Sequence, residues 1–412
     1  MTQSKNIIII GAGQAATGAA NSLRQYGFGG NIKIFGNENL PPYQRPPLSK
    51  AYLMGEMPLE RLQFRAQEQW EKDEIDLQIN DEILVINRAE KTVQTISGAI
   101  FGYDKLIIAT GSRVRMINIE GANLPNIHYL KSIKDSDDLG AKIENAKSIV
   151  IIGAGYIGLE VAAVARKKGL EVTVLEAAPR VLARVACQEL SQFYEKLHRD
   201  AGVKIVTDAS VIAFEGAQKL ESVRLKDGQS IECDVALVGI GILPNSEIAS
   251  DCGIICNNGI DTNENAQTSD ADIYACGDCA NRELALYGLR MRLESVHNAI
   301  EQAKLAAAHI MNQAMPKLDT PWFWSDQYDI KLQIAGLWNS AVKHIIRGDK
   351  AANKFAIFHL DEENRVLSVD AINSAPEFLI GKNLIAAKAK LAPEIIADIR
   401  ISAKELAARA TV

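Results

Sequence analysis

The chain has 412 residues, 47% of them hydrophobic and 23% charged, which is typical of a globular protein with two or three domains. Its formal net charge of −6 argues against nucleic-acid binding as the main task. No apolar run approaches the ~20 residues of a membrane helix, and residues 7–10 are too short a run for a signal peptide. We therefore expect a cytoplasmic protein that binds neither nucleic acid nor a membrane.

The first predicted unit begins with an apolar strand at residues 6–10, followed by Gly11-Ala-Gly13-Gln-Ala-Ala16 and a helix. Gly11 permits a tight turn, Gly13 lets the backbone approach a pyrophosphate, and the small Ala16 lets the helix pack close to the strand. The free N–H groups at the start of the helix then face phosphate. This strand–turn–helix pattern predicts a dinucleotide-binding unit, although a turn without a ligand is the alternative.

The next predicted strand, residues 31–35, is followed by Gly36-Asn37-Glu38. In dinucleotide-binding units, a carboxylate at this point accepts hydrogen bonds from the ribose. Glu38 is the only carboxylate near the strand end, and we predict that it contacts the ribose.

Residues 40–50 contain four prolines together with Arg45 and Lys50. The prolines disfavour a helix and favour a stiff, extended loop. Such a loop would hold Arg45 and Lys50 against a flat ligand, unless it is only a rigid linker.

A second fingerprint follows an apolar strand at residues 148–152. Its residues are Gly153, Ala154, Gly155, Tyr156, Ile157 and Gly158, and a helix continues to Lys168 with Gly169 as its C-cap. Two such units form an internal repeat, and two bound dinucleotides imply electron transfer between them. One would be a fixed flavin nucleotide and the other an exchanging nicotinamide nucleotide.

Glu176 follows the strand at residues 171–175 and lies 23 positions after Gly153. A carboxylate there accepts bonds from the ribose 2′-OH and repels a 2′-phosphate, which predicts NADH as the donor. Arg180 and Arg184 follow, and they are the only reason to consider NADPH.

Two buried strands ending in small-residue turns, at 106–111 and 235–245, are predicted to be the points where the chain passes between domains. We place Thr110 with the FAD-binding residues and Gly241 with the NAD-binding ones. The expected fold is α/β, with two Rossmann-like dinucleotide-binding domains and a C-terminal α+β domain. The predicted FAD-binding domain is discontinuous (1–112 and 244–320), with an NADH-binding domain at 113–243 and the C-terminal domain at 321–412.

Six cysteines all lie beyond residue 186, which is not a disulfide framework and suits a reducing compartment. Cys276 and Cys279 form a C-x-x-C that could be a redox dithiol or half a zinc site. No second C-x-x-C exists, and we expect no metal. In the preferred interpretation, Gly277-Asp278 forms a turn, and the Asp278 carboxylate hydrogen-bonds a polyol chain.

A helix of about fifteen residues is expected from Glu294. Its His297 could be an acid/base, although the preferred interpretation is a histidine whose hydrogen bonds are satisfied at the helix start. The aromatic segment 321–327 is interpreted as core or as a lid over a ring system. Short strands at 331–338, 342–347, 354–360 and 366–372 and a helical tail are expected after it.

At this point the sequence resembles the FAD-dependent, NADH-dependent ferredoxin reductases of oxygenase systems, which belong to the glutathione-reductase-like superfamily. The resemblance covers essentially the whole chain. It rests on the two fingerprints with Glu160, on Arg45-Pro-Pro-Leu-Ser-Lys50, on Gly277-Asp278, on Glu294-Ser-Val296 and on Trp322-Phe-Trp-Ser-Asp-Gln327. Many relatives have Gly-Asp where this chain has Gly36-Asn37, which affects only the expected ribose contact.

The resemblance implies that Ala15, Lys50, Asp278 and Val296 contact FAD. It also implies that Lys50 and Glu160 act beside the flavin–nicotinamide stack and that Trp324 borders the isoalloxazine. The implied partners are a [2Fe–2S] ferredoxin and, indirectly, a cytochrome P450 or Rieske oxygenase. A monomer or weak dimer is expected.

Residues 36–60 contain no cysteine, so no thiol relay is expected and electrons would leave the flavin directly. NADH gives two electrons and a [2Fe–2S] cluster takes one, a division that flavin can make. We expect Lys304, with Arg290 and Arg292 upstream, to steer the ferredoxin. A rubredoxin or monodehydroascorbate reductase, or an apoptosis-inducing-factor-like flavoprotein, remains the alternative.

Overall fold

The computed structural model describes residues 5–411, which divide into two compact units. The first unit combines the segment that ends at Gln44 with Leu59–Arg113 and Leu243–Pro321. The second unit combines Arg45–Pro58, Val114–Ile242 and the segment that begins at Trp322.

The first unit is built on a parallel five-stranded sheet in the order β19-β7-β1-β2-β3. Its strands are β1 (Asn6–Ile10), β2 (Asn31–Gly36), β3 (Ile75–Ile79), β7 (Lys105–Ile108) and β19 (Ile273–Ala275). The four isoleucines of β1 are almost fully buried, because helices or strands cover both faces of a parallel sheet.

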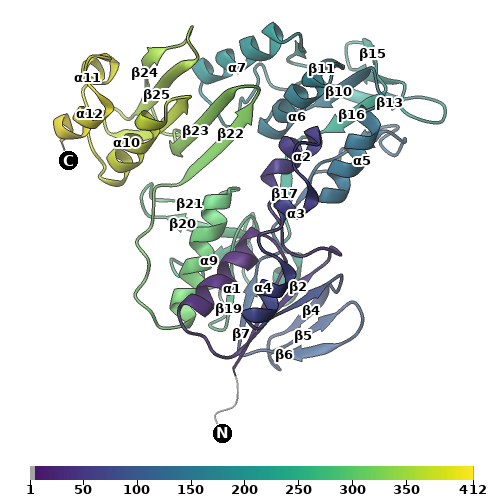
Figure 1. Ribbon diagram of the computed structural model, residues 1–412, viewed down its shortest axis with the longest axis vertical. Helices are drawn as coiled ribbons and strands as arrows, with labels where there is room; N and C mark the ends of the chain where they lie inside the picture. The colour runs from purple at the N-terminus through teal and green to yellow at the C-terminus, as the bar shows by residue number, and fades with distance from the viewer. Residues whose placement is uncertain (1–4, 412) are drawn as a thin grey trace. The chain divides into compact units, whose positions relative to one another are not determined.

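Helices α1 (Gln14–Gln25) and α9 (Val296–Ile310) lie side by side in the first unit (Figure 1). Their contact depends on small side chains. A Cβ on Gly18 would lie 3.1 Å from the Cβ of Ala303, so a larger side chain at Gly18 would push the helices apart. Val296 is the first residue of α9.

The other strands of the first unit form two small sheets. They are β4 (Ile83–Asn87), β5 (Thr92–Thr95) and β6 (Ile100–Gly102) in one sheet, and β18 (Ile260–Thr262), β20 (Ala280–Leu284) and β21 (Leu289–Met291) in the other. Short helices α3 (Leu59–Leu62), α4 (Gln67–Lys72) and α8 (Glu247–Asp251) complete the unit.

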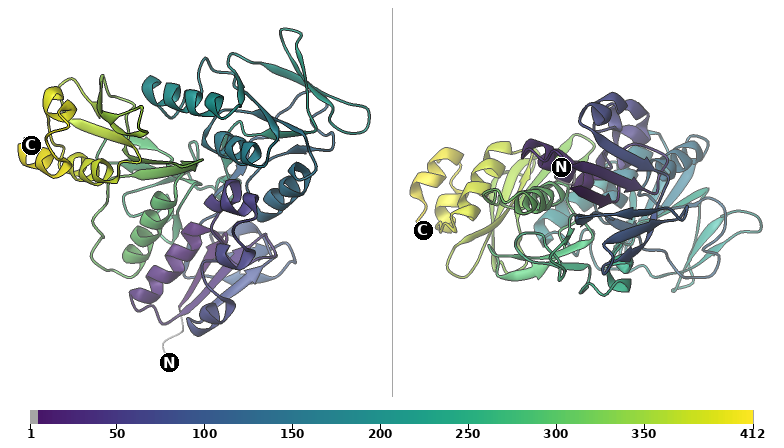
Figure 2. Two further views of the ribbon diagram at one scale, coloured as in Figure 1. Left: turned by 45° about the horizontal axis from the view of Figure 1, so that its top comes forward. Right: turned by 90° about the horizontal axis from the view of Figure 1, so that it is seen from below.

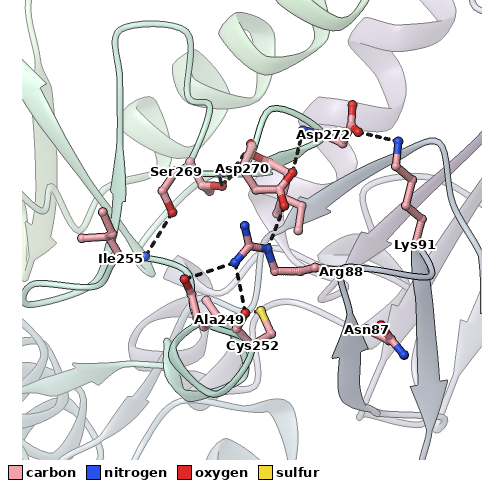
Figure 3. Close-up of polar contacts among 12 residues, drawn as sticks. Asn87, Arg88, Lys91, Ala249, Cys252, Ile255, Ser269, Asp270 and Asp272 are labelled. Carbon is pink, nitrogen blue, oxygen red and sulfur yellow. Dashed lines mark hydrogen bonds and ion pairs between the residues drawn. The ribbon is translucent and has the colours of Figure 1, made fainter.

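Arg88, just after β4, connects segments of the first unit that are distant in sequence (Figure 3). Its Nε donates to Asp270 at 2.7 Å, and its Nη1 donates to the carbonyl oxygens of Gly253 at 3.2 Å and Cys252 at 3.3 Å. Nearby, Lys91 pairs with Asp272 at 2.5 Å. These contacts fix the β4–β5 hairpin against the segment that leads into β19.

The second unit repeats the parallel design, with strand order β12-β11-β10-β16-β9. Its strands are β9 (Ile127–His128), β10 (Ser148–Ile152), β11 (Glu171–Leu175), β12 (Lys204–Val206) and β16 (Val235–Val238). Its helices are α5 (Ile133–Ile143), α6 (Tyr156–Lys167) and α7 (Gln188–Asp200), and an antiparallel sheet is formed by β13 (Val211–Glu215), β14 (Ser222–Leu225) and β15 (Ser230–Glu232).

Two of the chain passages between the units lie at β8 (Ser112–Val114) and β17 (Ile242–Pro244), which pair with each other. Within the described residues, no helix is both long enough and apolar enough to cross a membrane.

The proline-rich segment is more ordered than the extended loop that the sequence predicted. It forms a 3₁₀ turn, η1 (Pro46–Ser49), followed by the short helix α2 (Ala51–Met54). The expectation of no helix was wrong because Pro46 and Pro47 occupy the first positions of η1. A first-turn N–H has no partner within a helix, so its absence in proline costs nothing there.

The C-terminal part of the second unit is an antiparallel sheet in the order β22-β23-β26-β25-β24. Its strands are β22 (Trp322–Gln327), β23 (Ile330–Gly336), β24 (Lys343–Asp349), β25 (Lys354–Leu360) and β26 (Val366–Ile372). The aromatic segment is thus an edge strand, β22, which the strand prediction omitted. Its polar Ser325 and Gln327 are buried, so an alternation of apolar and polar residues gives no simple signal here.

The expected helical tail consists of three helices, α10 (Ala375–Ala386), α11 (Pro393–Ala397) and α12 (Ala403–Arg409). Lys388 has a positive φ of 52° after α10, and Pro393 starts α11, which explains the interruption. Both views in Figure 2 show these helices, in yellow, beside the C-terminal sheet.

Stability should depend on pH through His198 of α7, which is fully buried and bonds Gln327. Burial lowers the pKa of His198 to about 4 from 6.5. The unfolded chain therefore binds a proton that the folded protein excludes, and the associated stability is complete above pH 6.5 and lost as the pH falls toward 4. We expect this group to lower the free energy of unfolding by roughly 3 kcal/mol across that window.

Denaturant unfolding of the unmodified protein and of His198→Gln at several pH values measures this effect. The variant should lose less stability between pH 6.5 and pH 4. Equal losses in the two proteins would contradict the role of His198.

Candidate active site

The first fingerprint has the backbone geometry that a dinucleotide requires. Gly11 has a φ of +107°, and a Cβ there would lie 2.2 Å from the carbonyl oxygen of Ala109. Gly13 is the N-cap of α1, and no atom lies within 4 Å of its Cβ position, which leaves room for a phosphate beside the helix. Ala16 is fully buried under the turn. These residues fit a bound dinucleotide.

The turn at Asp278 lies against the same helix start. Gly277 has a φ of +85°, and its Cβ position is 3.1 Å from the Cβ of Ala15. Ser112 Oγ donates to Asp278 Oδ2 at 2.8 Å, and Arg292 Nη1 donates to the Asp278 carbonyl oxygen at 2.9 Å. The Asp278 backbone is thus anchored by Arg292, and its carboxylate, bonded to Ser112, lies near the first fingerprint.

Other FAD candidates of the first unit lie near this turn or at the end of β2. Thr110 Oγ1 donates to the Asn245 carbonyl oxygen at 2.6 Å, and Gln302 Oε1 of α9 accepts from the Gly277 N–H at 2.6 Å. Glu38, two residues after β2, accepts from the Tyr43 hydroxyl at 2.6 Å. Asn37 does not take part in this contact.

The second fingerprint is more tightly constrained than the first. Gly153 has a φ of +104°, and a Cβ there would lie 2.4 Å from the Gly239 carbonyl oxygen. A Cβ on Gly158 would lie 2.2 Å from the Gly153 carbonyl oxygen, so only glycine fits at this third position. Gly155 has open space at its Cβ position, and the neighbouring Ile157 is 46% exposed.

Glu176 is held at the second fingerprint by two backbone bonds. The Ala154 N–H donates to Oε2 at 2.7 Å, and the Ala178 N–H donates to Oε1 at 2.9 Å. Each oxygen has a further lone pair that a ribose hydroxyl can use. The carboxylate is therefore positioned before any nucleotide arrives.

The two arginines after Glu176 differ in availability. Arg180 donates to the carbonyl oxygens of Ala186 at 2.8 Å and Ala183 at 3.0 Å and to Ser191 Oγ at 2.5 Å. This arginine holds its own loop, so the expectation that it could serve a 2′-phosphate was wrong. Arg184 is exposed, and its guanidinium lies 3.8 Å from the Cβ position of Gly241.

Glu160 of α6 is the centre of a polar network in the second unit. Its side chain is only 3% exposed, and its Oε2 lies 2.7 Å from Lys50 Nζ. Ser49 Oγ donates to Oε2 at 2.5 Å, and Ser325 Oγ of β22 donates to Oε1 at 2.6 Å. A buried carboxylate requires such compensation, because an unpaired charge in the interior is strongly unfavourable.

The network continues away from Glu160 into the protein. Gln327 Nε2 donates to Ser325 Oγ at 3.2 Å, and Gln327 Oε1 lies 2.8 Å from His198 Nε2. Burial keeps His198 neutral near pH 7, so the chain of contacts adds no second charge beside Glu160. Arg45 donates from Nη1 to the Lys131 carbonyl oxygen at 2.8 Å, which anchors the other end of the proline-rich segment.

Aromatic rings form a row along β22. Phe323 lies 4.8 Å from the Tyr156 ring, and Trp324 lies 5.5 Å from Trp322, measured between ring centroids. The Tyr156 phenol is buried, which raises its pKa well above 10. Trp324 is half-buried and reaches the surface of its own unit.

Cys276 and Cys279 are fully buried, and burial raises the pKa of both thiols. Cys279 Sγ contacts the carbonyl oxygens of Cys276 and Ile108 at 3.4 and 3.6 Å. Protonated, enclosed thiols are poor nucleophiles, so this geometry favours the interpretation as a packed turn over that as a redox dithiol.

The sequence did not single out several residues that hold the site. These are Ser49, Ser112, Ser325 and Gln327. Ser49 lies inside the proline-rich motif, and Ser325 and Gln327 lie inside the aromatic motif. The sequence therefore contained the signal for these residues but did not show which side chains they bond. Arg292 had been assigned to a steering surface, which was wrong because its side chain is 9% exposed and bonds Asp278 and Glu294.

Comparisons with known proteins agree with this architecture. The pyridine nucleotide-disulphide oxidoreductase family matches residues 5–303, and the reductase C-terminal family matches residues 322–407. The chain is 41% identical to a probable ferredoxin reductase, CtmF, of Castellaniella defragrans, over 99% of this chain and 100% of that protein. It is 39% identical to putidaredoxin reductase CamA of Pseudomonas putida, over 100% of this chain and 98% of that protein.

The crystal structure of a covalent putidaredoxin reductase–putidaredoxin complex contains a chain that superposes with a TM-score of 0.96 at 39% identity, covering 98% of this chain and 99% of that one. Both the expected family and the expected glutathione-reductase-like fold are thereby confirmed. The chain belongs to the pyridine nucleotide-disulphide oxidoreductase family, in the group of putidaredoxin reductase-like ferredoxin reductases that carry a reductase C-terminal domain.

Proposed function

We propose that this protein takes electrons from NADH, by way of FAD, and passes them one at a time to a [2Fe–2S] ferredoxin that serves a cytochrome P450 or Rieske oxygenase. The overall reaction consumes one NADH and two oxidised ferredoxins and yields NAD⁺, a proton and two reduced ferredoxins. We place this reaction in the cytoplasm and expect a monomer or weak dimer. Three domains would divide the work: residues 1–112 with 244–320 for FAD, 113–243 for NADH, and 321–412 as the C-terminal domain.

One observation carries the proposal: the buried pair of Glu160 and Lys50 joins the start of α6, the proline-rich segment and β22. Glu160 lies on α6, the helix that follows the nicotinamide-type fingerprint, and Lys50 is the N-cap residue of α2 in the proline-rich segment. FAD, when bound, accepts two electrons and releases them singly. Lys50 and Glu160 would orient the nicotinamide and hold charge at its reactive end, and neither needs to act as a nucleophile.

Residues of the first unit would hold the FAD. Gly11, Gly13 and Ala16 would leave the start of α1 open to the pyrophosphate, Ala15 and Val296 would contact the cofactor, and Glu38 would accept from a ribose hydroxyl. Thr110 and Asp278 would be further contacts. We also assign Arg45, Lys50 and Trp324, which belong to the second unit, to FAD binding, with Lys50 and Trp324 beside the ring. The position of the Asp278 carboxylate, bonded to Ser112 in the turn that packs on Ala15, supports this assignment.

Residues of the second fingerprint would hold NADH, namely Gly153, Gly155, Tyr156, Ile157, Gly158, Glu176 and Gly241. The exposed Ile157 and the open Cβ position of Gly155 support a nucleotide at the start of α6. The restrained carboxylate of Glu176 supports NADH over NADPH, since a 2′-phosphate would meet a negative charge that cannot turn away.

The electron acceptor that the protein reduces fastest distinguishes this proposal from the alternatives. Reduction of purified [2Fe–2S] ferredoxins should be faster than reduction of rubredoxin or monodehydroascorbate, with two ferredoxins reduced per NADH. Preference for either of the other two acceptors would overturn the assignment. An apoptosis-inducing-factor-like role would instead predict poor turnover even with ferricyanide.

Replacing Glu176, the carboxylate that we propose binds the ribose, should weaken the preference for NADH over NADPH. We expect Glu176→Gln to lower kcat/KM for NADH by roughly 10-fold, which corresponds to ~1.4 kcal/mol, and to leave NADPH unchanged or improved. The matched control is Glu171→Gln, at the exposed start of β11. Steady-state assays with ferricyanide measure both donors, and equal efficiency of NADH and NADPH in the unmodified protein would exclude the role of Glu176.

Removing the charge of Glu160 should affect only the NADH half of the reaction. We expect Glu160→Gln to slow flavin reduction by about tenfold, because Lys50 loses its buried partner and the nicotinamide its orientation. Stopped-flow absorbance measures this step, and reoxidation by ferricyanide should stay near normal. The control, Glu195→Gln, breaks the more exposed pair with Arg199 on α7. Slower reoxidation with unchanged reduction would contradict the assigned role.

Ferredoxin docking should depend on Lys304, which is exposed on α9. With Arg292 buried, Lys304 is the stronger test of electrostatic steering. We expect Lys304→Glu to lower the rate of ferredoxin reduction several-fold at low salt, with a smaller effect at physiological salt, where screening acts beyond ~8 Å. Lys226→Glu, exposed between β14 and β15, is the charge-matched control. Equal slowing with ferricyanide would show that the docking surface lies elsewhere.

A further inference from the structure

A second cluster of reactive side chains lies inside the second unit, outside the Glu160 network. Cys187, His359 and Asp370 each offer a metal-ligand atom, and these three atoms all lie within 4.8 Å of one another. Their exposures are 2%, 0% and 1%. The positions are far apart in sequence, so no motif reveals them. We propose that Cys187, His359 and Asp370 bind one Zn²⁺ ion or a similar thiophilic divalent cation.

The fold brings these side chains together for identifiable reasons. Cys187 is the N-cap residue of α7. His359 of β25 pairs with Ser368 of β26, and Asp370 lies two residues beyond Ser368 on the same face. His359 and Asp370 are therefore diagonal neighbours across an antiparallel pair, within reach of each other. His359 Nε2 lies 2.9 Å from Asp370 Oδ2, so a small outward movement of the two side chains gives the ~3.3 Å that separates two ligands at ~2.0 Å from a tetrahedral metal.

The cluster contains acceptor atoms that the protein leaves unused. Asp370 Oδ1 is buried without a hydrogen-bond partner, and so is Glu189 Oε2. A buried carboxylate oxygen without a donor is unfavourable, and a cation would compensate it. Asp370 thus supplies an independent indication of a missing positive charge.

His344 of β24 supplies the outer partner that a metal-bound histidine needs. Its Nδ1 lies 2.8 Å from His359 Nδ1. Without a metal, the Nε2–H of His359 donates to Asp370, and its Nδ1 accepts from His344. With a metal on Nε2, His359 carries its proton on Nδ1 and donates it to His344, the arrangement typical of metal-ligating histidines. The contact between the two rings is kept, and its direction reverses.

Metal binding at this cluster should release a proton. A cysteine binds a metal as the thiolate, so the Cys187 proton leaves to solvent when the metal binds. Binding should therefore release about one proton per metal.

The ligand types indicate the class of metal. One sulfur, one imidazole nitrogen and carboxylate oxygen are the donors that Zn²⁺ prefers, whereas Mg²⁺ and Ca²⁺ prefer oxygen alone. Trp338 covers the two histidines, with its ring centroid 6.3 Å from each, and donates from Nε1 to the Val185 carbonyl oxygen at 3.3 Å. This apolar cover limits water access to the cluster.

The site would also join two parts of the second unit. Cys187 ends the loop that begins after Glu176, and Arg180 of that loop donates to the Cys187 carbonyl oxygen at 3.4 Å. A metal at Cys187 would tie this loop to strands β25 and β26. Bound Zn²⁺ should accordingly raise the melting temperature of the FAD-loaded protein, since a ligand of the native state alone stabilises it.

The test uses the full-length, FAD-loaded protein, stripped with a chelator and then given Zn²⁺. After gel filtration, metal analysis should find about one Zn²⁺ per chain, and X-ray absorption should show one sulfur at ~2.3 Å with nitrogen or oxygen at ~2.0–2.1 Å. Calorimetry in buffers of different ionisation enthalpy should show release of about one proton. Absence of stoichiometric zinc, or a spectrum without sulfur, would overturn the proposal.

Variants assign the ligands. Cys187→Ser and Asp370→Asn should each weaken Zn²⁺ binding by roughly 100-fold or more, and each should remove the rise in melting temperature. Cys233→Ser changes another buried cysteine of the same unit, whose pKa is raised to about 12, and should bind zinc as the unmodified protein does. Unchanged affinity in Cys187→Ser would overturn the proposal. If that variant does not fold, Asp370→Asn and the spectrum of the unmodified protein give the decision.

Discussion

The buried charge of Glu160 is the constraint on which the second unit depends. A carboxylate that is 3% exposed is tolerated only when its charge and its oxygens are compensated. Lys50 and Ser49 come from the proline-rich segment, and Ser325 comes from β22. Removing one member of a buried pair typically lowers the free energy of unfolding by ~3–5 kcal/mol. The folded second unit therefore depends on α6, the proline-rich segment and β22 together. The geometry of α6 is thus fixed by residues far from it in sequence.

The two fingerprints share one backbone conformation but differ in the room they leave for a side chain at the third position. In each, a glycine with positive φ passes close to the carbonyl oxygen of the next parallel strand, at Ala109 or at Gly239. At the third position, Ala16 is accommodated in the first fingerprint, whereas Gly158 has no room for a Cβ in the second. The second helix therefore starts closer to its turn.

The acids that follow the two fingerprints are also held differently. Glu176 is fixed by backbone N–H groups, which have no rotational freedom, whereas Glu38 is held by the Tyr43 hydroxyl, which can turn. An exchanging nucleotide benefits from a carboxylate fixed in advance, because less entropy is lost at each binding event. A cofactor that stays bound needs this advantage less. The difference agrees with NADH at the second fingerprint and FAD at the first.

The sequence by itself determined the elements whose signal is local. A run of four apolar β-branched residues, a glycine turn and an alanine-rich helix specify each βαβ unit within about thirty residues, and both units formed as expected. The family followed from motifs of the same short range. What the sequence left open, only the tertiary structure decided. The family resemblance had already placed Lys50 and Glu160 together beside the flavin, and the structure shows their ion pair. The strand β22, the contact of Arg292 with Asp278 and the Cys187 cluster were not predicted, because each depends on packing between segments that are separated along the chain. Such contacts depend on strand register and on which buried groups lack a partner, and neither leaves a periodic trace in the chain.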